Sequence, residues 1–418
     1  MTHTARFVIV GAGLAGAKAA EALRDVGFDG HISLLGAEPY RPYERPPLSK
    51  DYLQGISTID KLFVHSEGWY TDNNVDLRLA TEVTALDRHA RRVTFGNGDL
   101  VHYDKLLLAT GSSPRRLKVP GADLDGVLYL RTLEDSDRIK RAFVPDAHVV
   151  VIGGGWIGLE TAAAARAAGS HVTVLEHADL PLLGVLGPQI AQVFADLHRD
   201  HGVDLRCGIA VAGIRSRAKD NPSVAAVTLV DGSEVRADVV IVGVGVAPND
   251  SLARTSGLKV ENGIVVDEHL RSSDPDVFAA GDIANAYHPR LGRHLRVEHW
   301  ANAVHQPAVA ANAMIGGSSL YERLPYFYTD QYDLGMEYTG YAAAGDYDNV
   351  VVRGDLAKRE FIAFWMRGRR VLAGMNVNVW DVTGTIKELI QSRVEADPGI
   401  LADPDVSLGD LLPSRPSQ

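Results

Sequence analysis

The sequence predicts an α/β protein with two parallel β-sheets, because one pattern of buried strand, glycine-rich turn, helix and second strand occurs twice along the chain. The first copy begins at residues 7–10 and the second at residues 149–152. A third block is rich in predicted strands at 325–379, ends in a helix at 382–394 and lacks the pattern, so we expect a separate domain there.

The first copy joins a buried strand to a helix-forming segment at 17–24 through Gly11-x-Gly13-x-x-Gly16. Gly11 permits a tight turn, Gly13 lets the backbone approach a pyrophosphate, and Gly16 lets the helix pack closely on the strand. Free N–H groups at the helix N-terminus favour an anion. We therefore expect a dinucleotide site; a glycine-rich turn without a ligand is the alternative.

Charged residues follow the second predicted strand, 31–35. Glu38 lies 22 positions after Gly16, close to the spacing of an acid that binds a ribose hydroxyl, or it is an exposed loop carboxylate. Two prolines after Arg45 predict an extended segment with no helix before Leu48. Arg45 and Lys50 either hold a ligand or are solvated surface residues.

The region 75–113 is predicted to be a β-rich insertion, with a hairpin turn at 96–98 and a buried strand from 105. Further buried strands are expected at 239–242 and 277–280. The second of these ends on Asp282, which either hydrogen-bonds a polyol or caps a turn. A helix is expected at 301–314.

The second copy carries Gly153-x-Gly155-x-x-Gly158, a helix at 159–168 and a strand at 171–175. This strand ends directly on Glu176, 18 positions after Gly158, where an acid binds the ribose and repels a 2′-phosphate, so NAD is favoured over NADP. Two complete units in one chain predict two bound dinucleotides.

Bulk composition limits the function classes. The 418 residues carry a net charge of −11, which disfavours general nucleic-acid binding. No apolar run approaches the about 18 residues of a membrane span. Because a strand is predicted within seven residues of the first residue, we expect no signal peptide. One cysteine, Cys207, excludes an internal disulfide and suits a reducing cytoplasm. No metal site is predicted.

Taken together, the motifs resemble the flavoproteins of the glutathione reductase type that bind two dinucleotides. Within them the chain is similar to the ferredoxin reductases of bacterial oxygenase systems, the putidaredoxin and biphenyl dioxygenase types, and more distantly to apoptosis-inducing factors. Besides both glycine turns, the resemblance rests on residues 45–50, 109–111, 129–134, 277–282 and 329–333.

This resemblance implies a discontinuous FAD domain at 1–113 and 246–320, an NAD domain at 114–245 and an α+β C-terminal domain at 321–418. The FAD contacts it implies are Gly11, Gly13, Leu14, Ala15, Gly16, Glu38, Arg45, Lys50, Val83, Ala109, Thr110, Gly111, Arg131, Gly281, Asp282 and Trp300. The NAD contacts it implies are Gly153, Gly155, Trp156, Ile157, Gly158, Glu176 and Gly245.

The resemblance also implies roles for some of these residues. Lys50 lies near the reactive ring nitrogen of the flavin, with Glu160 as its ion partner, and Trp300 faces the flavin. We expect these three to modulate the cofactors rather than to act as acid–base catalysts; an ordinary helix residue and a core tryptophan are the alternatives for Glu160 and Trp300. Asp282 is expected to hold the ribityl chain or diphosphate, and Val83 to meet adenine through its backbone. His299 has no assigned role.

Disulfide reductases of this superfamily need a cysteine pair where this chain has residues 43–50, and Cys207 is predicted to be a small core residue. Electrons are therefore expected to pass from NADH through FAD to an external [2Fe–2S] ferredoxin that serves an oxygenase. The alternatives are another one-electron acceptor (rubredoxin, a quinone or a radical) and an NADH sensor like apoptosis-inducing factor. Arg290, Arg293 and Arg296, or the cations at 358–359 and 367–370, are candidate docking charges or plain surface residues. The oligomeric state is expected to be a monomer or a homodimer.

Overall fold

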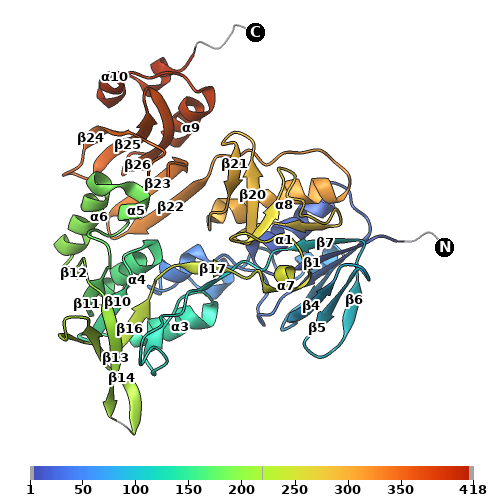
Figure 1. The fold of residues 1–418 in the computed structure, drawn as a ribbon, viewed down its shortest axis with the longest axis horizontal. Helices are drawn as coiled ribbons and strands as arrows, with labels where there is room; N and C mark the ends of the chain where they lie inside the picture. The colour runs from blue at the N-terminus through green and yellow to red at the C-terminus, as the bar shows by residue number, and fades with distance from the viewer. Residues whose placement is uncertain (1–3, 219, 414–418) are drawn as a thin grey trace. The chain divides into compact units, whose positions relative to one another are not determined.

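A computed structural model describes residues 4–218 and 220–413, which form two compact units. The first unit contains the residues up to 46 together with 58–113 and 246–323, and the second contains 47–57, 114–245 and the residues from 324 onward. The N-terminal, blue part of Figure 1 carries the β1–α1–β2 succession, and the green part carries the second copy.

The first unit is built on a five-stranded parallel sheet in the order β19-β7-β1-β2-β3. Its strands are β1 (Arg6–Val10), β2 (His31–Leu35), β3 (Val75–Arg78), β7 (Lys105–Leu108) and β19 (Val277–Ala279). Helix α1 (Leu14–Asp25) follows β1 and packs against α8 (Trp300–Met314). The strands and helices expected at 7–10, 17–24, 31–35, 105–108, 277–279 and 301–314 are confirmed.

The prediction of an insertion over the whole of 75–113 is wrong at both ends of this region. Strand β3 pairs in parallel with β2 at the edge of the main sheet, and β7 lies between β1 and β19 in the same sheet. The smaller antiparallel sheet contains β4 (Val83–Asp87), β5 (Arg92–Phe95) and β6 (Leu100–His102). Its hairpin at 96–98 is confirmed, with Gly98 at φ +90°.

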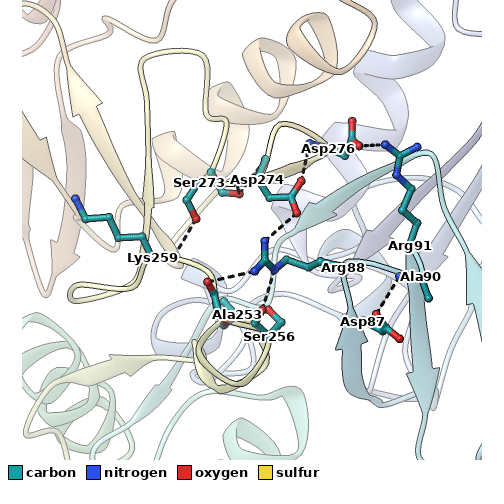
Figure 2. A network of polar contacts seen from close by, with 12 residues as sticks. Asp87, Arg88, Ala90, Arg91, Ala253, Ser256, Lys259, Ser273, Asp274 and Asp276 are labelled. Atoms are coloured by element: carbon teal, nitrogen blue, oxygen red, sulfur yellow. Dashed lines mark hydrogen bonds and ion pairs between the residues drawn. The ribbon is translucent and has the colours of Figure 1, made fainter.

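Arg88, directly after β4, anchors this small sheet to the rest of the first unit (Figure 2). Its guanidinium donates to the Ser256 carbonyl (2.8 Å) and pairs with Asp274 (3.0 Å). Arg91 pairs with Asp276, which also binds Lys105 at 2.7 Å. The remaining elements of this unit are η2 (Ile59–Lys61), α2 (Trp69–Asp72), β17 (Val246–Pro248), α7 (Ser251–Thr255), β18 (Ile264–Val266), β20 (Ala284–His288) and β21 (Arg293–Leu295).

The second unit repeats the parallel arrangement in the strand order β12-β11-β10-β16-β9. These strands are β9 (Val127–Leu128), β10 (His148–Ile152), β11 (His171–Leu175), β12 (Asp204–Arg206) and β16 (Val239–Val242). Its helices before residue 245 are α3 (Leu133–Ala142), α4 (Trp156–Ala167), α5 (Leu183–Leu186) and α6 (Pro188–Asp200). An antiparallel sheet of β13 (Val211–Ala218), β14 (Asn221–Leu229) and β15 (Glu234–Arg236) is attached.

The C-terminal part of the second unit is a five-stranded antiparallel sheet followed by helices, and the predicted strand-rich block and final long helix are confirmed. Its elements are β22 (Tyr326–Gln331), β23 (Leu334–Gly340), β24 (Asn349–Asp355), β25 (Glu360–Arg367), β26 (Arg370–Val377), α9 (Thr383–Ser392), α10 (Pro398–Ala402) and η3 (Leu408–Leu411). Leu159 of α4, Phe194 of α6 and Trp365 of β25 are fully buried in one hydrophobic cluster, so this sheet shares a core with helices α4 and α6.

The proline segment corrects another prediction. Pro46–Ser49 forms a 3₁₀ turn, η1, instead of the predicted extended segment. A proline φ near −65° suits a 3₁₀ turn, and neither proline has to donate, because the turn is closed by the Lys50 N–H bonding to the Pro47 carbonyl. Strand β8 (Ser112–Pro114) precedes the point at which the chain enters the second unit. Within the described residues no helix is long and apolar enough to cross a membrane.

Candidate dinucleotide sites

The turn between β1 and α1 depends on its glycines for two different reasons. Gly11 has φ +113°, and a Cβ there would lie 2.2 Å from the Ala109 carbonyl oxygen; a Cβ on Gly16 would lie 1.9 Å from the Gly11 oxygen. By contrast, a Cβ on Gly13 would meet no protein atom within 4 Å. The backbone therefore requires Gly11 and Gly16, while Gly13 opens the turn to space that a ligand can enter.

Helix α1 presents its N-terminus at this turn. Gly13 is the N-cap, no side chain caps the helix, and its first turn contains no acidic residue. Leu14 and Ala15 supply the first turn and are buried. The residues 109–111 follow β7, the neighbour of β1, so this predicted group lies together at the carboxyl edge of the sheet. These features fit a bound diphosphate.

Glu38 and Arg45 form an ion pair, with 2.6 Å between Glu38 Oε1 and Arg45 Nη2. Tyr43 also donates its hydroxyl to Glu38. Burial opposes the charge on Arg45, but Tyr43, Glu38 and Asp282 together raise its pKa above the ordinary value. The structure therefore brings these two predicted contacts together as one paired group near Asp282.

Val83 begins β4, and the segment before it lies beside the end of β2. The Thr81 N–H donates to the Gly36 carbonyl (2.7 Å), and the Ala80 N–H donates to the Glu38 carbonyl (3.0 Å). Val83 therefore lies two residues after Thr81, whose backbone contacts the segment that follows β2 and carries Glu38.

The end of β19 lies against the first turn. A Cβ on Gly281 would come 3.1 Å from the Ala15 Cβ, and the Gly281 N–H donates to Gln306 (2.7 Å). Asp282 accepts a hydrogen bond from Ser112 at 2.7 Å. Ser112 and Gln306 are polar partners that sequence reasoning missed, because nothing local distinguishes them from other surface-type residues.

Trp300 is the first residue of α8, and His299 is its N-cap. Burial lowers the pKa of His299 to about 4, with Asp282 acting in the opposite direction. His299 is therefore a neutral imidazole close to Asp282 and Trp300, although the sequence suggested no role for it.

Arg131, another predicted FAD contact, belongs to the second unit, where its backbone N–H donates to Asp135 (3.1 Å).

The turn between β10 and α4 reproduces the first turn. Gly153 has φ +105°, and a Cβ there would lie 2.4 Å from the Gly243 oxygen; a Cβ on Gly158 would lie 2.1 Å from the Gly153 oxygen. A Cβ on Gly155 meets nothing within 4 Å. The backbone again requires two glycines and leaves the middle one facing open space, which fits a second diphosphate.

The other predicted NAD contacts differ in their exposure and in their partners. Glu176 accepts hydrogen bonds from the backbone N–H groups of Gly154 (2.5 Å) and Ala178 (2.7 Å). Ile157 is 44% exposed, whereas the Trp156 ring packs on Phe194 and Phe327. Trp156 thus contributes its backbone to the turn and its side chain to the core. Gly245, at φ +91°, bonds through its carbonyl to the Arg115 N–H (2.9 Å).

Lys50 and Glu160 are joined within the second unit by a 2.8 Å contact between Lys50 Nζ and Glu160 Oε1. Their side chains are 12% and 3% exposed. The Ser49 hydroxyl donates to the other carboxylate oxygen (2.5 Å), and the Thr329 hydroxyl donates to Oε1 (2.6 Å). Lys50 Nζ also lies 5.4 Å from the ring centre of Tyr328. The predicted ion pair is therefore present, and both of its side chains are largely buried.

Cys207 follows β12 directly and is half-buried. Burial raises the pKa of its thiol. It packs against the second parallel sheet, as a small hydrophobic residue does, although it is neither inside a strand nor fully buried.

The candidate docking cations are largely paired. Arg290 pairs with Glu322 (3.0 Å), and Arg296 pairs with Glu298 (2.6 Å). In the second unit, Arg369 pairs with Asp397 at 3.0 Å. These contacts reduce the positive charge that either cluster presents to solvent.

Comparisons with known proteins agree with this geometry. The pyridine nucleotide-disulphide oxidoreductase family model matches residues 5–307, and a reductase C-terminal model matches residues 326–412. The chain is 40% identical to putidaredoxin reductase of Pseudomonas putida, covering 97% of this chain and 96% of that protein. It is 41% identical to the ferredoxin–NAD(+) reductase component of the anthranilate 1,2-dioxygenase system of Burkholderia cepacia, with 97% and 99% covered.

Among solved structures, the crystal structure of the covalent putidaredoxin reductase–putidaredoxin complex matches with a TM-score of 0.94 and 40% identity, over 97% of this chain and 98% of that one. The matched family ranges cover both parallel sheets and the C-terminal sheet. The chain belongs to the pyridine nucleotide-disulphide oxidoreductase family, as a flavoprotein oxidoreductase that uses FAD and NAD(H).

Proposed function

We propose that this protein is an NADH-dependent ferredoxin reductase that passes electrons one at a time to a [2Fe–2S] ferredoxin serving an oxygenase. The observation that carries the proposal is a pair of dinucleotide turns in a chain with no cysteine at residues 43–50. Electrons have no dithiol route from this place, so they leave for an external acceptor. The two ferredoxin-system relatives, each matched along almost its whole length, support this assignment.

The first unit is proposed to hold FAD. Its contacts are Gly11, Gly13, Leu14, Ala15, Gly16, Glu38, Arg45, Val83, Ala109, Thr110, Gly111, Gly281, Asp282 and Trp300. Gly13 and the α1 N-terminus orient the diphosphate, and the paired Glu38 presents a carboxylate to a ribose. When bound, FAD supplies the chemistry that takes a hydride from NADH and releases single electrons.

The second unit is proposed to hold NADH through Gly153, Gly155, Trp156, Ile157, Gly158, Glu176 and Gly245. Glu176 is the residue that selects NADH. Two backbone donors hold its carboxylate at the end of β11, where a 2′-phosphate would meet a fixed negative charge.

Lys50 is proposed to stabilise negative charge on the flavin, with Glu160 holding its ammonium in place and Arg131 as a further flavin contact. A lysine on a flexible stem reaches many positions, and a buried ion pair restricts it to few. Trp300, Lys50 and Glu160 tune the cofactors, so no side-chain nucleophile or general acid is needed. We also infer a cytoplasmic location, which the single half-buried cysteine suits.

The test is anaerobic stopped-flow absorbance of the purified yellow protein, mixed first with NADH or NADPH and then with a [2Fe–2S] ferredoxin. We expect rapid bleaching by NADH, much slower bleaching by NADPH, and fast recovery of the yellow colour only with ferredoxin.

Three outcomes would contradict the proposal. A persistent charge-transfer band with slow transfer to every acceptor would indicate an NADH sensor. Recovery that is faster with rubredoxin or a quinone would indicate a different acceptor. A colourless protein that takes up no FAD would contradict the flavoprotein assignment itself.

A further inference from the structure

A row of buried polar side chains leads from Glu160 to helix α6. The Thr329 hydroxyl donates to Glu160 Oε1 (2.6 Å), and the Gln331 side-chain amide donates to Thr329 Oγ1 (3.2 Å). The Gln331 carbonyl oxygen lies 2.9 Å from His198 Nε2. Thr329 and Gln331 are each 1% exposed and His198 is fully buried. We call Thr329, Gln331 and His198 the relay.

The hydrogen bonds of the relay all run in one direction. A carboxylate only accepts, so Thr329 donates to Glu160, and the Thr329 oxygen then accepts from the NH₂ group of Gln331. This orientation turns the Gln331 oxygen toward His198, which therefore donates from Nε2. The remaining nitrogen, His198 Nδ1, faces the Tyr332 hydroxyl at 3.3 Å.

A neutral imidazole at the end of the relay donates from Nε2 to Gln331 and leaves Nδ1 as an acceptor for the Tyr332 hydroxyl. Burial lowers the pKa of His198 to about 4, with a smaller opposing effect of the Gln331 hydrogen bond. His198 is therefore neutral at physiological pH, and its tautomer is fixed by its two neighbours.

We propose that His198 and Gln331 are positioning residues for the Lys50–Glu160 pair, holding the Glu160 carboxylate, through Thr329, in the orientation that meets the Lys50 ammonium. Aligned hydrogen bonds in a buried site polarise one another, so removing a distant member weakens the bond to Glu160. Without the donor at His198, the Gln331 amide is free to turn over, and the Thr329 hydroxyl can then turn from Glu160 toward Gln331. Among the described contacts, the carboxylate keeps those with Ser49 and Lys50.

The consequence for electron transfer rests on the proposed function, in which Lys50 acts on the flavin. The relay itself does not, because all of its members lie in the second unit and contact one another directly. The two ideas therefore need separate measurements.

The first measurement is ¹⁵N NMR of histidine-labelled full-length protein at neutral pH. We expect His198 to be neutral with its proton on Nε2, and its signal is assigned by its loss in His198→Gln. In Gln331→Met this tautomer should lose its dominance. A neutral His198 ring with its proton on Nδ1 would overturn the relay whether or not the protein binds FAD.

The second measurement compares His198→Leu with His198→Gln in the FAD-loaded protein. The glutamine amide nitrogen reaches the place of imidazole Nε2, so His198→Gln can still donate to Gln331. We expect His198→Leu to slow flavin bleaching by NADH about three- to tenfold, the effect of one weakened hydrogen bond. The flavin midpoint potential should become more negative in the same variant, and His198→Gln should restore both values.

His201→Leu is the matched control. His198 lies in the last turn of α6, and His201 is the C-cap of the same helix. His201 stacks on Tyr332 with ring centres 3.8 Å apart, and in the described part of the chain its Nδ1 bonds to the Leu197 carbonyl and not to a relay residue. Its substitution should change neither the bleaching rate nor the potential. An equal effect of His198→Leu and His201→Leu would mean that packing alone matters, and it would overturn the proposal.

A double-mutant comparison asks whether the relay acts through Glu160. In a Glu160→Gln background, His198→Leu should cause no further slowing, because the group it positions is already altered. Equal slowing in both backgrounds would overturn the proposal. If His198→Leu does not fold, the same comparison is made with Thr329→Val. This substitution keeps the shape of the side chain and removes its hydroxyl.

Discussion

The carboxylate of Glu176 accepts a hydrogen bond from the backbone N–H of Gly154, at 2.5 Å, in the middle of the second glycine turn. Its other oxygen accepts from the Ala178 N–H. The Glu176 carboxylate is therefore held by the same backbone turn that the diphosphate is proposed to approach. The carboxylate and the turn together form the proposed NADH site.

Glu176→Gln should weaken the preference for NADH. The amide keeps the size of the side chain but presents an NH₂ group to one of the two backbone donors and removes the negative charge. We expect the KM for NADH to rise about five- to tenfold, as for one lost charged hydrogen bond, while the KM for NADPH falls. Steady-state assays with an artificial one-electron acceptor measure both. Asp179→Asn, an exposed acid nearby, is the control, and an unchanged NADH/NADPH ratio in Glu176→Gln would contradict the role.

Gly155→Ala should separate ligand binding from folding. The new methyl group meets no protein atom within 4 Å, and φ −79° suits alanine, so the thermal unfolding midpoint should stay within about 2 °C of the wild type. It enters the proposed diphosphate space, so the KM for NADH should rise at least about tenfold. Fluorimetric melting and NADH kinetics test this. Gly96→Ala, in the hairpin of the small sheet, should change neither value.

Gly158→Ala is the opposite case in the same turn. Its Cβ would lie 2.1 Å from the Gly153 oxygen, so the helix must move away from the strand. We expect a much lower melting midpoint or no folded protein. A Gly158→Ala protein with normal stability would contradict the packing role of this glycine.

The elements that could be predicted are those specified by adjacent residues. Strands β1 and β10 are apolar runs, and the glycine spacing after each of them marks the turn and the helix. Strand β3 was placed wrongly because its partner, β2, is set by long-range pairing that the alternation within residues 75–78 does not encode. The 3₁₀ turn at 46–49 was missed because proline φ values fit both an extended segment and this turn.

The site shows the same division. The glycines and Glu176 have a fixed spacing, so sequence alone identified them as candidates, whereas the pairing of Lys50 with Glu160 came from family resemblance. Ser49 and Thr329 reach Glu160 across 111 and 169 residues, respectively, of sequence. Such contacts depend on how strands and helices pack, and no local pattern announces them.

Lys50→Met should destabilise the protein more than the loss of an exposed lysine would. The Glu160 side chain is 3% exposed, and the substitution leaves its charge buried without an ion partner. We expect a loss of about 3 kcal/mol in unfolding free energy, and most of it should return in Lys50→Met/Glu160→Gln, which removes the orphaned charge.

The flavin midpoint potential gives a second, independent prediction for Lys50. It should be more negative in both the single and the double variant, because each lacks the cation. Chemical unfolding and potentiometric titration measure the two effects, and Lys61→Met, an exposed lysine, is the control. A normal potential in Lys50→Met would contradict the proposed action on the flavin.

Arg88→Met should loosen the small antiparallel sheet from the first unit. Arg88 satisfies the Ser256 carbonyl and pairs with Asp274, whose side chain is 16% exposed (Figure 2). We expect about 2 kcal/mol of destabilisation, because a backbone carbonyl and a largely buried carboxylate each lose one donor. Arg92→Met removes an ion pair whose two side chains are each 42% exposed, so it should cost under about 1 kcal/mol. Similar urea midpoints for the two variants would contradict the anchoring role.

Acid should destabilise the second unit partly through His198. Its pKa is near 4 in the folded protein and near 6.5 in the unfolded chain, so between these values the unfolded state binds the extra proton. Stability is then unaffected by this residue above pH 6.5, falls as the pH drops toward 4, and loses about 3 kcal/mol in all. His198→Gln has no such proton, so its urea midpoint should fall less between pH 7 and 4.5. His171→Gln, an exposed histidine, is the control and should follow the wild-type slope. Parallel slopes for wild type and His198→Gln would mean that His198 takes up its proton equally in the folded and unfolded states, and this would contradict the lowering of its pKa by burial.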